Sequence, residues 1–285
     1  MQKKYLSVLL IVLFSSGYLI MLLVQGSPTG PEIEVGSSTL TSSDWAGYVA
    51  SSDLQNPQPE VTGVNGSWIV PQIGGSLSDT FSAIWVGVGG FFDGTLIQAG
   101  SEQDRLGGSD YYSVWYELLP SDSITIDSIN VVPGDIITVA VRLVDSATNT
   151  WSIEVQDMTN GGSFKESFRY DSSKLSAEWI AERPDVNNTT STLANFGNVT
   201  FTGSGAVISS QSEKIGALPF AQVSMTDKNA VLATVSSLSS DGSTFTVNYA
   251  ESNSLSNNFQ FIIVFALILA IVSIWTRIAH SKPKY

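Results

Sequence analysis

Short apolar or alternating runs recur along the chain from Trp45 onward, and Gly, Asn, Asp or Pro separates most of them. Such alternation is typical of β-strands, and many short strands with regular turns favour an antiparallel sandwich or barrel. The predicted strands are 44–50, 61–70, 81–88, 95–98, 111–118, 124–130, 136–144, 151–157, 163–170, 177–182, 199–201, 221–226 and 243–249. Between the two ends of the chain, no apolar pattern of helical period exceeds about ten residues. The sequence therefore predicts an all-β domain.

Two uninterrupted apolar segments, 5–24 and 259–275, bracket this region. Each has close to the ~20 residues that cross a bilayer as a helix. Lysines precede the first segment, and Arg and Lys residues follow the second. The positive-inside rule then places both termini in the cytoplasm and the middle of the chain outside. The first segment is either a signal anchor or a cleaved signal peptide, and the middle is exported in both cases.

The predicted organisation follows from these segments and from the composition between them. Residues 26–43 are rich in Gly, Ser, Thr and Pro, which is typical of a flexible lead-in. The predicted order is a signal peptide or signal anchor at 1–25, a lead-in at 26–43, a β-sandwich domain at 44–250, a linker at 251–258, a transmembrane helix at 259–276 and a cytoplasmic tail at 277–285. We therefore expect a cell-membrane protein whose domain lies on the extracellular side and whose ends contact the lipid bilayer.

The exported part is strongly acidic. It holds all 26 Asp and Glu residues but only eight of the 13 Lys and Arg residues, which gives it a formal net charge of −18. This charge argues against nucleic acid as a partner. It suits a soluble domain at a cell surface and low pH, where protonation relieves the repulsion. The chain has no Cys, so the core must stabilise an exported domain without disulfides.

The residues that are missing limit the chemistry further. The only histidine is His280, in the predicted cytoplasmic tail. The exported domain therefore lacks a Ser-His-Asp triad, a Cys-His pair and a His-based zinc site. No Gly-rich phosphate loop follows a strand and opens a helix, so nucleotide binding is not expected either. We predict no cofactor and no metal, and any acid or base in the domain must be Asp, Glu, Tyr or Lys.

The segment from Ala177 to Pro184 carries two carboxylates in a predicted strand. Because side chains alternate between faces, Glu178 and Glu182 share one face with Ile180. A carboxylate on a buried sheet face is costly unless it is paired, hydrogen-bonded or partly wet. The segment is thus either an ordinary exposed face with solvated acids or part of a site.

Tryptophans and one amide stand in other predicted strands. Tyr111, Ser113, Trp115 and Glu117 share a strand face, which describes a groove for an extended polymer or the edge of an ordinary core. Gln98 lies in an apolar strand and needs hydrogen-bond partners, either as a structural amide or as part of a site.

Taken together, these segments resemble the glutamic peptidase family, the eqolisins, over about residues 44–205. The motifs occur in the family's order: Trp45-Ala-Gly, Trp68-Ile-Val-Pro, Trp85-Val-Gly-Val-Gly-Gly, Leu96-Ile-Gln-Ala-Gly, Trp115-Tyr-Glu and Ala177-Glu-Trp-Ile-Ala-Glu. The resemblance implies an antiparallel two-sheet sandwich of the concanavalin-like or jelly-roll type, with the active site on a concave sheet face. It also implies an endopeptidase whose substrates are proteins or peptides and whose activity is favoured at acidic pH.

The resemblance assigns roles to individual residues. Glu182 matches the catalytic glutamate, which takes a proton from water and later protonates the leaving amine. Gln98 matches the catalytic glutamine, which stabilises the oxyanion. Substrate-groove positions are implied for Trp45, Trp85, Trp115 and Glu117. Glu117 is expected to orient groups near the catalytic pair, and Glu178 is left open between a structural and a functional role.

Two departures weaken the inference to a strongly acidic optimum. Gly89 stands where fungal members tend to have an acidic residue, and Glu102 stands near the place of their Asp after the Leu-x-Gln-x-Gly motif. The predicted membrane anchors also differ from a freely secreted enzyme.

Three other functions remain open. A lectin-like or peptide-binding sandwich would keep the groove without catalysis. A glycoside hydrolase would use two of Glu117, Glu178 and Glu182. A structural surface-layer protein would need none of these groups. The peptidase hypothesis is favoured because it alone accounts for Gln98, Glu117 and Glu182 together.

Overall fold

The structure is a computed structural model that describes residues 39–187, 189–228 and 230–251. The strands are β1 (Thr39–Ser42), β2 (Trp45–Ala50), β3 (Val61–Ile69), β4 (Thr80–Gly89), β5 (Leu96–Leu106), β6 (Ser109–Leu118), β7 (Ile124–Thr125), β8 (Ile136–Asp145), β9 (Thr150–Asp157), β10 (Ser163–Arg169), β11 (Ala177–Glu182), β12 (Asp185–Val186), β13 (Thr189–Thr190), β14 (Asn198–Ile208), β15 (Gln211–Lys214), β16 (Phe220–Asp227), β17 (Ala230–Val235) and β18 (Phe245–Tyr249). A single 3₁₀ turn, Ile215–Ala217, is the one helical element in the described part of the chain. The prediction of an all-β domain is confirmed.

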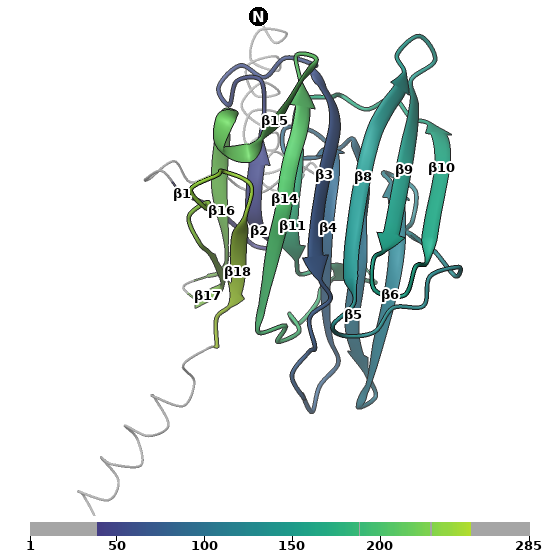
Figure 1. Cartoon of the computed structure of the whole chain (residues 1–285). Coiled ribbons are helices and arrows are strands. Elements are labelled where there is room, and N and C mark those ends of the chain that lie inside the picture. Colours follow the sequence, from purple (N-terminus) through teal and green to yellow (C-terminus); the bar gives the residue numbers. More distant parts are fainter. Residues whose placement is uncertain (1–38, 188, 229, 252–285) are drawn as a thin grey trace, which may run out of the picture.

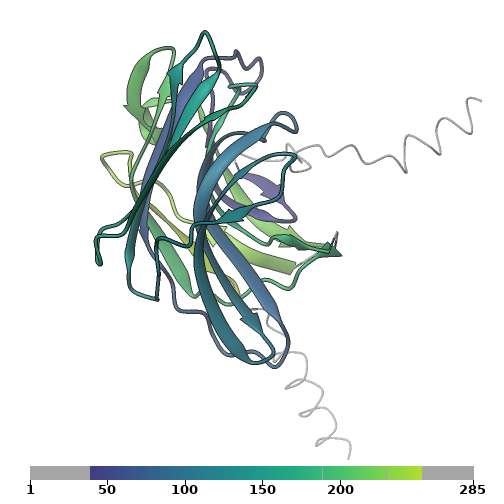
Figure 2. The same cartoon turned by 90° about the vertical axis from the view of Figure 1, so that its right-hand side faces the viewer.

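The strands lie in two layers packed face to face (Figures 1 and 2). Strands β10, β9, β8, β3 and β14 form one layer, here called the β3 layer, which is nearer the viewer in Figure 1. Strands β16, β2, β11, β4, β5 and β6 form the other, here called the β11 layer. Apart from the parallel pairing of β1 with β16, the paired strands are antiparallel. The structure is thus the antiparallel two-sheet sandwich that the sequence predicts.

Strand β14 connects the two layers. Its residues 202–208 pair with β3, and its residues 198–201 pair instead with β18. The register shifts between Thr202 and Gly205, and Gly203 at this point has a φ of +59°, a conformation that glycine adopts without a steric cost. The change of partner lets one continuous path of hydrogen bonds run through both layers.

The main core fills the space between the layers. Trp179 and Ala181 of β11 point into it, together with Trp68, Trp151 and Phe201 from the β3 layer. Ile180, between the two β11 core residues, points to the opposite face and packs in a second, smaller cluster. The alternation predicted for β11 is therefore present, and it places Glu178 and Glu182 on the face away from the main core.

Several strands differ in extent from the prediction. Strand β5 runs to Leu106 rather than ending at Gln98. Its buried polar residues Ser101 and Gln103 are bonded internally: Gln103 donates to Ser101 Oγ at 2.7 Å, and Trp68 Nε1 donates to the same oxygen at 2.9 Å. The predicted strand at 124–130 is a strand only over its first two residues.

The structure also contains strands where none were predicted. Residues 39–42, counted with the lead-in, form β1 beside β16, and β17 pairs with β18. The apolar segments 5–24 and 259–275 lie outside the described residues. Within residues 39–187, 189–228 and 230–251, no helix is long and apolar enough to cross a membrane.

Candidate active site

The strand registers bring most of the predicted site residues onto the outer face of the β11 layer. Strand β11 lies between β2 and β4, and β4 in turn pairs with β5 and β5 with β6. Three neighbouring rows of paired positions run across the strands: Trp45–Glu182–Ala83–Glu102, then Ile180–Trp85–Gly100–Trp115, then Glu178–Gly87–Gln98–Glu117. Residues from five separate strands therefore share one surface.

Glu182 is held by two indole groups. Trp85 Nε1 donates to its Oε2 at 2.5 Å, and Trp45 Nε1 lies 3.4 Å from its Oε1. The two rings meet edge to face with centroids 5.1 Å apart. Burial, followed by the nearby charge of Asp44, raises the pKa of Glu182 to about 8, and the two indole donors oppose this shift. The side chain is only partly buried, so it remains reachable from solvent.

Gln98 is held by Glu117. The amide Nε2 of Gln98 donates to Glu117 Oε2 at 2.6 Å, and Gln98 is 4% exposed. Since an ionised carboxylate only accepts hydrogen bonds, Glu117 fixes which end of the amide faces it. The Gln98 Oε1 atom has no hydrogen-bond partner among the described residues. Burial is the largest cause that raises the pKa of Glu117, and the bond from Gln98 lowers it.

Glu182 and Gln98 are not in direct contact. Glu182 on β11 is in register with Glu102 on β5, and β4 lies between these strands. Gln98 is four residues before Glu102 on β5, and Trp85 of β4 lies in the row between Glu182 and Gln98. The charge of Glu117 is nevertheless among the causes that raise the pKa of Glu182, so the two groups act within one electrostatic environment.

A glycine makes room for the central ring. A Cβ atom at Gly100 would lie 2.2 Å from the Ile84 carbonyl oxygen and 2.6 Å from Trp85 Cβ. The missing side chain therefore lets β4 and the base of the Trp85 side chain approach β5 closely, and a Gly100 substitution would displace the residue whose ring holds Glu182.

The predicted groove tryptophans are more buried than an open groove wall requires. Trp45, Trp85 and Trp115 are 7%, 0% and 6% exposed and pack with Ile180 in the second cluster. Trp115 Nε1 is buried and has no partner among the described residues. The three rings thus form the floor of the site, with one free donor.

Comparison with known proteins connects this geometry to a family. The model of the peptidase A4 family matches residues 43–249. The chain belongs to the peptidase A4 family. The family match confirms the resemblance of the sequence to the glutamic peptidase family.

Individual relatives agree with this assignment. Aspergillopepsin-2 of Aspergillus niger is 28% identical over 189 residues, which cover 58% of this chain and 64% of that protein, slightly less than two thirds of its length. The crystal structure of aspergilloglutamic peptidase from Aspergillus niger superposes with a TM-score of 0.54 at 26% identity and covers 60% of this chain and 99% of that one. Scytalido-glutamic peptidase with a transition-state analogue inhibitor has a TM-score of 0.62 at 23% identity over 73% of this chain and 98% of that one, which shows a shared fold.

This peptidase A4 family member contains a fully buried carboxyl, Glu178, and a partly buried one, Asp104, whose burial the sequence did not indicate. Glu178 is 0% exposed, so the interpretation of this strand face as an ordinary exposed one is wrong for Glu178. Burial holds the pKa of Glu178 well above its usual range. Burial and the neighbouring Glu102 raise the pKa of Asp104 to about 8. No sequence signal marks Asp104, since its burial depends on the pairing of β5.

The sequence predicts no metal ion in the domain. In the part of the chain that the structure describes, no group of three or more His, Cys, Asp or Glu residues is arranged to hold a metal ion.

The raised carboxyl pKa values predict how the stability of this family member depends on pH. Glu178, Glu182, Asp104 and Glu117 all have higher pKa values in the folded chain than the value near 4 expected when unfolded. Below that pH these carboxyls are protonated in both the folded and the unfolded chain, so their ionisation does not change the free energy of unfolding. As pH rises to about 8, the unfolded chain ionises while the fold resists ionisation, so the free energy of unfolding falls.

We expect the melting temperature of residues 26–258 to fall by at least about 5 °C between pH 4.5 and pH 8. Glu178→Gln should flatten this dependence, because it removes the most deeply buried of the four carboxyls. Calorimetry of both proteins across this range provides the measurement. A melting temperature that rises with pH here would contradict the prediction.

Proposed function

We propose that this domain hydrolyses peptide bonds in protein substrates, with Glu182 activating water and Gln98 stabilising the oxyanion. The observation that carries the proposal is the shared face on which two indoles hold Glu182 and a carboxylate holds Gln98. Each group is thus fixed before substrate binds, as catalysis by preorganised groups requires. We further propose that segments 1–25 and 259–276 hold the domain at the outer surface of the cell membrane, where its substrates are proteins at or near that surface.

The chemistry needs one ionisable residue and one neutral amide. The Glu182 carboxylate takes a proton from a water molecule as that water attacks the scissile carbonyl carbon. An N–H of Gln98 donates to the oxygen on which negative charge develops, an interaction typically worth ~3 kcal/mol of the barrier. Protonated Glu182 then gives its proton to the departing amine, and the tetrahedral intermediate collapses to the acid and the amine.

The neighbours of each group fit these roles. The indole donors of Trp45 and Trp85 hold the Glu182 carboxylate, and they stabilise its ionised form against burial. Glu117 accepts one amide hydrogen of Gln98 and leaves the second for the substrate oxygen. In this proposal Glu117 is a positioning residue, because it acts through Gln98.

The pKa of Glu182 bears on the working pH. A general base is effective when its pKa lies near the operating pH, and a pKa of about 8 suits neutral rather than strongly acidic conditions. In this proposal the folded state is most stable at acidic pH, whereas the rate of cleavage rises towards neutral pH because the reaction needs ionised Glu182. Asp44 is the second cause of the raised pKa and is held by a bond from Ser42 Oγ of 2.5 Å.

The test measures cleavage of unfolded casein by residues 26–258 from pH 3 to pH 9, with peptide release followed by mass spectrometry. We expect kcat/KM to rise with pH towards the pKa of Glu182, about 8. Asp44→Asn should move this rise to lower pH, because it removes a repulsive charge. The exposed Asp127→Asn serves as the matched control and should leave the profile unchanged.

Other outcomes separate the alternatives. A folded protein that cleaves nothing at any pH would favour the binding module. Undiminished cleavage at pH 4 would show that Glu182 does not start as a carboxylate with a raised pKa. Release of sugars from a glycan substrate, with no peptide release, would favour the glycoside hydrolase.

A further inference from the structure

Exposed apolar side chains gather at one end of the sandwich. Eleven large hydrophobic side chains are exposed in the described part of the chain. Strand pairing and loop contacts place six of them at the end where β3 and β5 finish and where β4, β8 and β14 begin: Ile69, Leu77, Leu106, Val132, Ile136 and Met158. Scattered single apolar residues need no explanation, but a concentration at one end does.

Four of these residues form a patch on the β3 layer, here called the end patch. Ile69 and Ile136 are directly opposite each other on β3 and β8 and are 57% and 43% exposed. Met158, 59% exposed, donates its backbone N–H to the Ile136 carbonyl. Val132, 50% exposed, accepts a hydrogen bond from the backbone N–H of Asp135, which immediately precedes Ile136. The four side chains therefore belong to one local surface.

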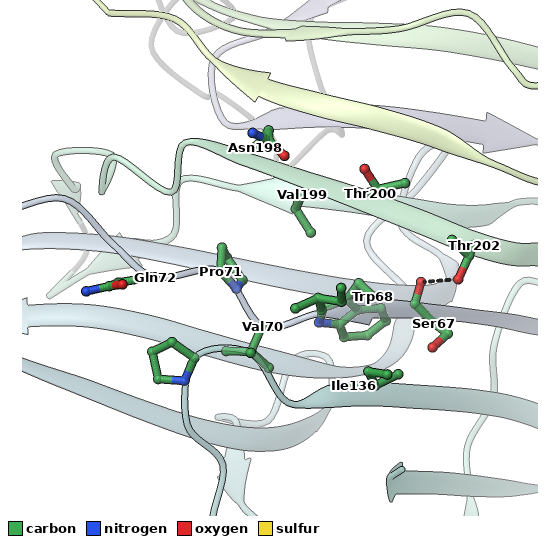
Figure 3. Close-up of a pocket in the computed structure, with 13 residues that line it drawn as sticks. Ser67, Trp68, Val70, Pro71, Gln72, Ile136, Asn198, Val199, Thr200 and Thr202 are labelled. Atoms are coloured by element: carbon green, nitrogen blue, oxygen red, sulfur yellow. Dashed lines mark hydrogen bonds between the residues drawn. The ribbon is translucent and has the colours of Figure 1, made fainter. Parts of the chain in front are cut away.

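The end patch continues into an uncharged groove of about 650 Å³ between β3 and β14 (Figure 3). The groove begins at Thr202, the first β14 residue to pair with β3, and extends along the preceding residues of β14, which do not pair with β3. The lining residues include Trp68, Val70, Pro71 and Val199, and none of the thirteen is charged. In a chain with 26 acidic residues, this is a surface without a charged lining. Its chemistry fits an apolar partner rather than a charged one.

The chain leaves the domain beside this groove. Asn198, on its wall, pairs with Asn248, and the N–H of Tyr249 donates to the Gly197 carbonyl. Seven residues separate Glu251, the last described residue, from the apolar segment that starts at Phe259. Eight residue steps span at most about 28 Å even when fully extended. A membrane-spanning 259–276 segment would therefore keep this end of the sandwich close to the bilayer.

We propose that the end patch contacts the lipid bilayer and orients the domain on the membrane. The exposed apolar side chains enter the interfacial layer, and the neutral amides of Gln72 and Asn198 face the headgroups. The patch lies on the β3 layer, whereas Glu182 and Gln98 lie on the outer face of the β11 layer, so this contact leaves the candidate active site open to substrate. The proposal rests on the membrane anchoring proposed above and is independent of the catalytic mechanism.

The absence of Cys from the chain makes a direct test simple. Ile69→Cys and Ile136→Cys are each labelled with an environment-sensitive dye in the full chain, which is reconstituted into phosphatidylcholine vesicles. Val144→Cys is the matched control, since Val144 is 58% exposed and lies at the opposite end of β8. Lipids carrying a nitroxide near the headgroup quench only dyes that touch the interface.

We expect nitroxide lipid to quench the dyes at positions 69 and 136 at least about threefold more than the dye at 144, with a blue-shifted emission at the first two positions. Equal, weak quenching at all three positions in a chain that floats with the vesicles would overturn the lipid contact and leave the anchoring intact. A chain that does not float would overturn the anchoring on which the proposal rests. Protection of positions 69 and 136 from aqueous iodide without lipid quenching would show contact with a second copy and would overturn the proposal. Casein cleavage, measured on the same samples, reports separately on the catalytic proposal.

Discussion

Replacing Glu182 with Gln is expected to lower kcat/KM for casein at least about 1000-fold while leaving the fold intact. General base catalysis typically contributes 10²–10⁴-fold, and Glu182 serves twice in the proposed cycle, as base and then as acid. An amide of nearly the same shape still offers an oxygen to the indole donors of Trp85 and Trp45. The loss should therefore be in chemistry rather than in packing.

The stability of this variant provides a second readout. Glu182 resists ionisation in the folded state, so it lowers the free energy of unfolding as pH approaches 8. A neutral Gln at this position removes that loss of stability. We expect Glu182→Gln to melt at a higher temperature than the wild type at pH 8 and at a similar temperature at pH 4.5. Glu213→Gln, on the exposed strand β15, is the matched control and should change neither activity nor melting by more than the error of measurement. Cleavage retained by Glu182→Gln would exclude the proposed mechanism.

The fold class could be read from the sequence because the strands follow local patterns. Alternation within 177–182 correctly predicts that Trp179 and Ala181 lie on the opposite face from Glu178, Ile180 and Glu182. Which of the two faces packs in the main core is shown only by the structure. The pattern failed where polar residues are buried and bonded to one another, as for Ser101 and Gln103 on β5. Hydropathy cannot distinguish a satisfied buried amide from a solvated one.

The geometry of the site could not be predicted from local patterns alone. The two indoles that contact Glu182 lie 137 and 97 residues away in the chain, on the strands on either side of β11. Which strands become neighbours is a property of the whole sheet, and only the resemblance to a family indicated that these segments meet. The burial of Glu178 and the raised pKa of Asp104 likewise follow from strand pairing, which no local motif records.

Gln98→Ala is expected to lower kcat by about 100- to 1000-fold with little change in KM. Removal of one preorganised oxyanion donor typically has an effect of this size, because the interaction strengthens only as charge develops on the substrate oxygen. Glu117→Gln should cost less, about tenfold, because Gln98 keeps both amide hydrogens and loses only the charged acceptor that orients it. The kinetics of casein cleavage at pH 8 provide the measurement.

The double variant tests whether Glu117 acts through Gln98. If Glu117 only positions the amide, Glu117→Gln has nothing left to disturb once Gln98 is Ala, and the double variant should be no slower than Gln98→Ala alone. Additive losses would show instead that Glu117 acts on the substrate itself, and they would favour a mechanism with two carboxylates over one with a carboxylate and an amide. The Gln98→Glu variant should not recover the activity that Gln98→Ala loses. A carboxylate at position 98 is repelled by Glu117 and, when ionised, has no hydrogen to donate to the oxyanion. The amide is the required group in this proposal because it donates a hydrogen bond to the substrate while remaining uncharged at every pH.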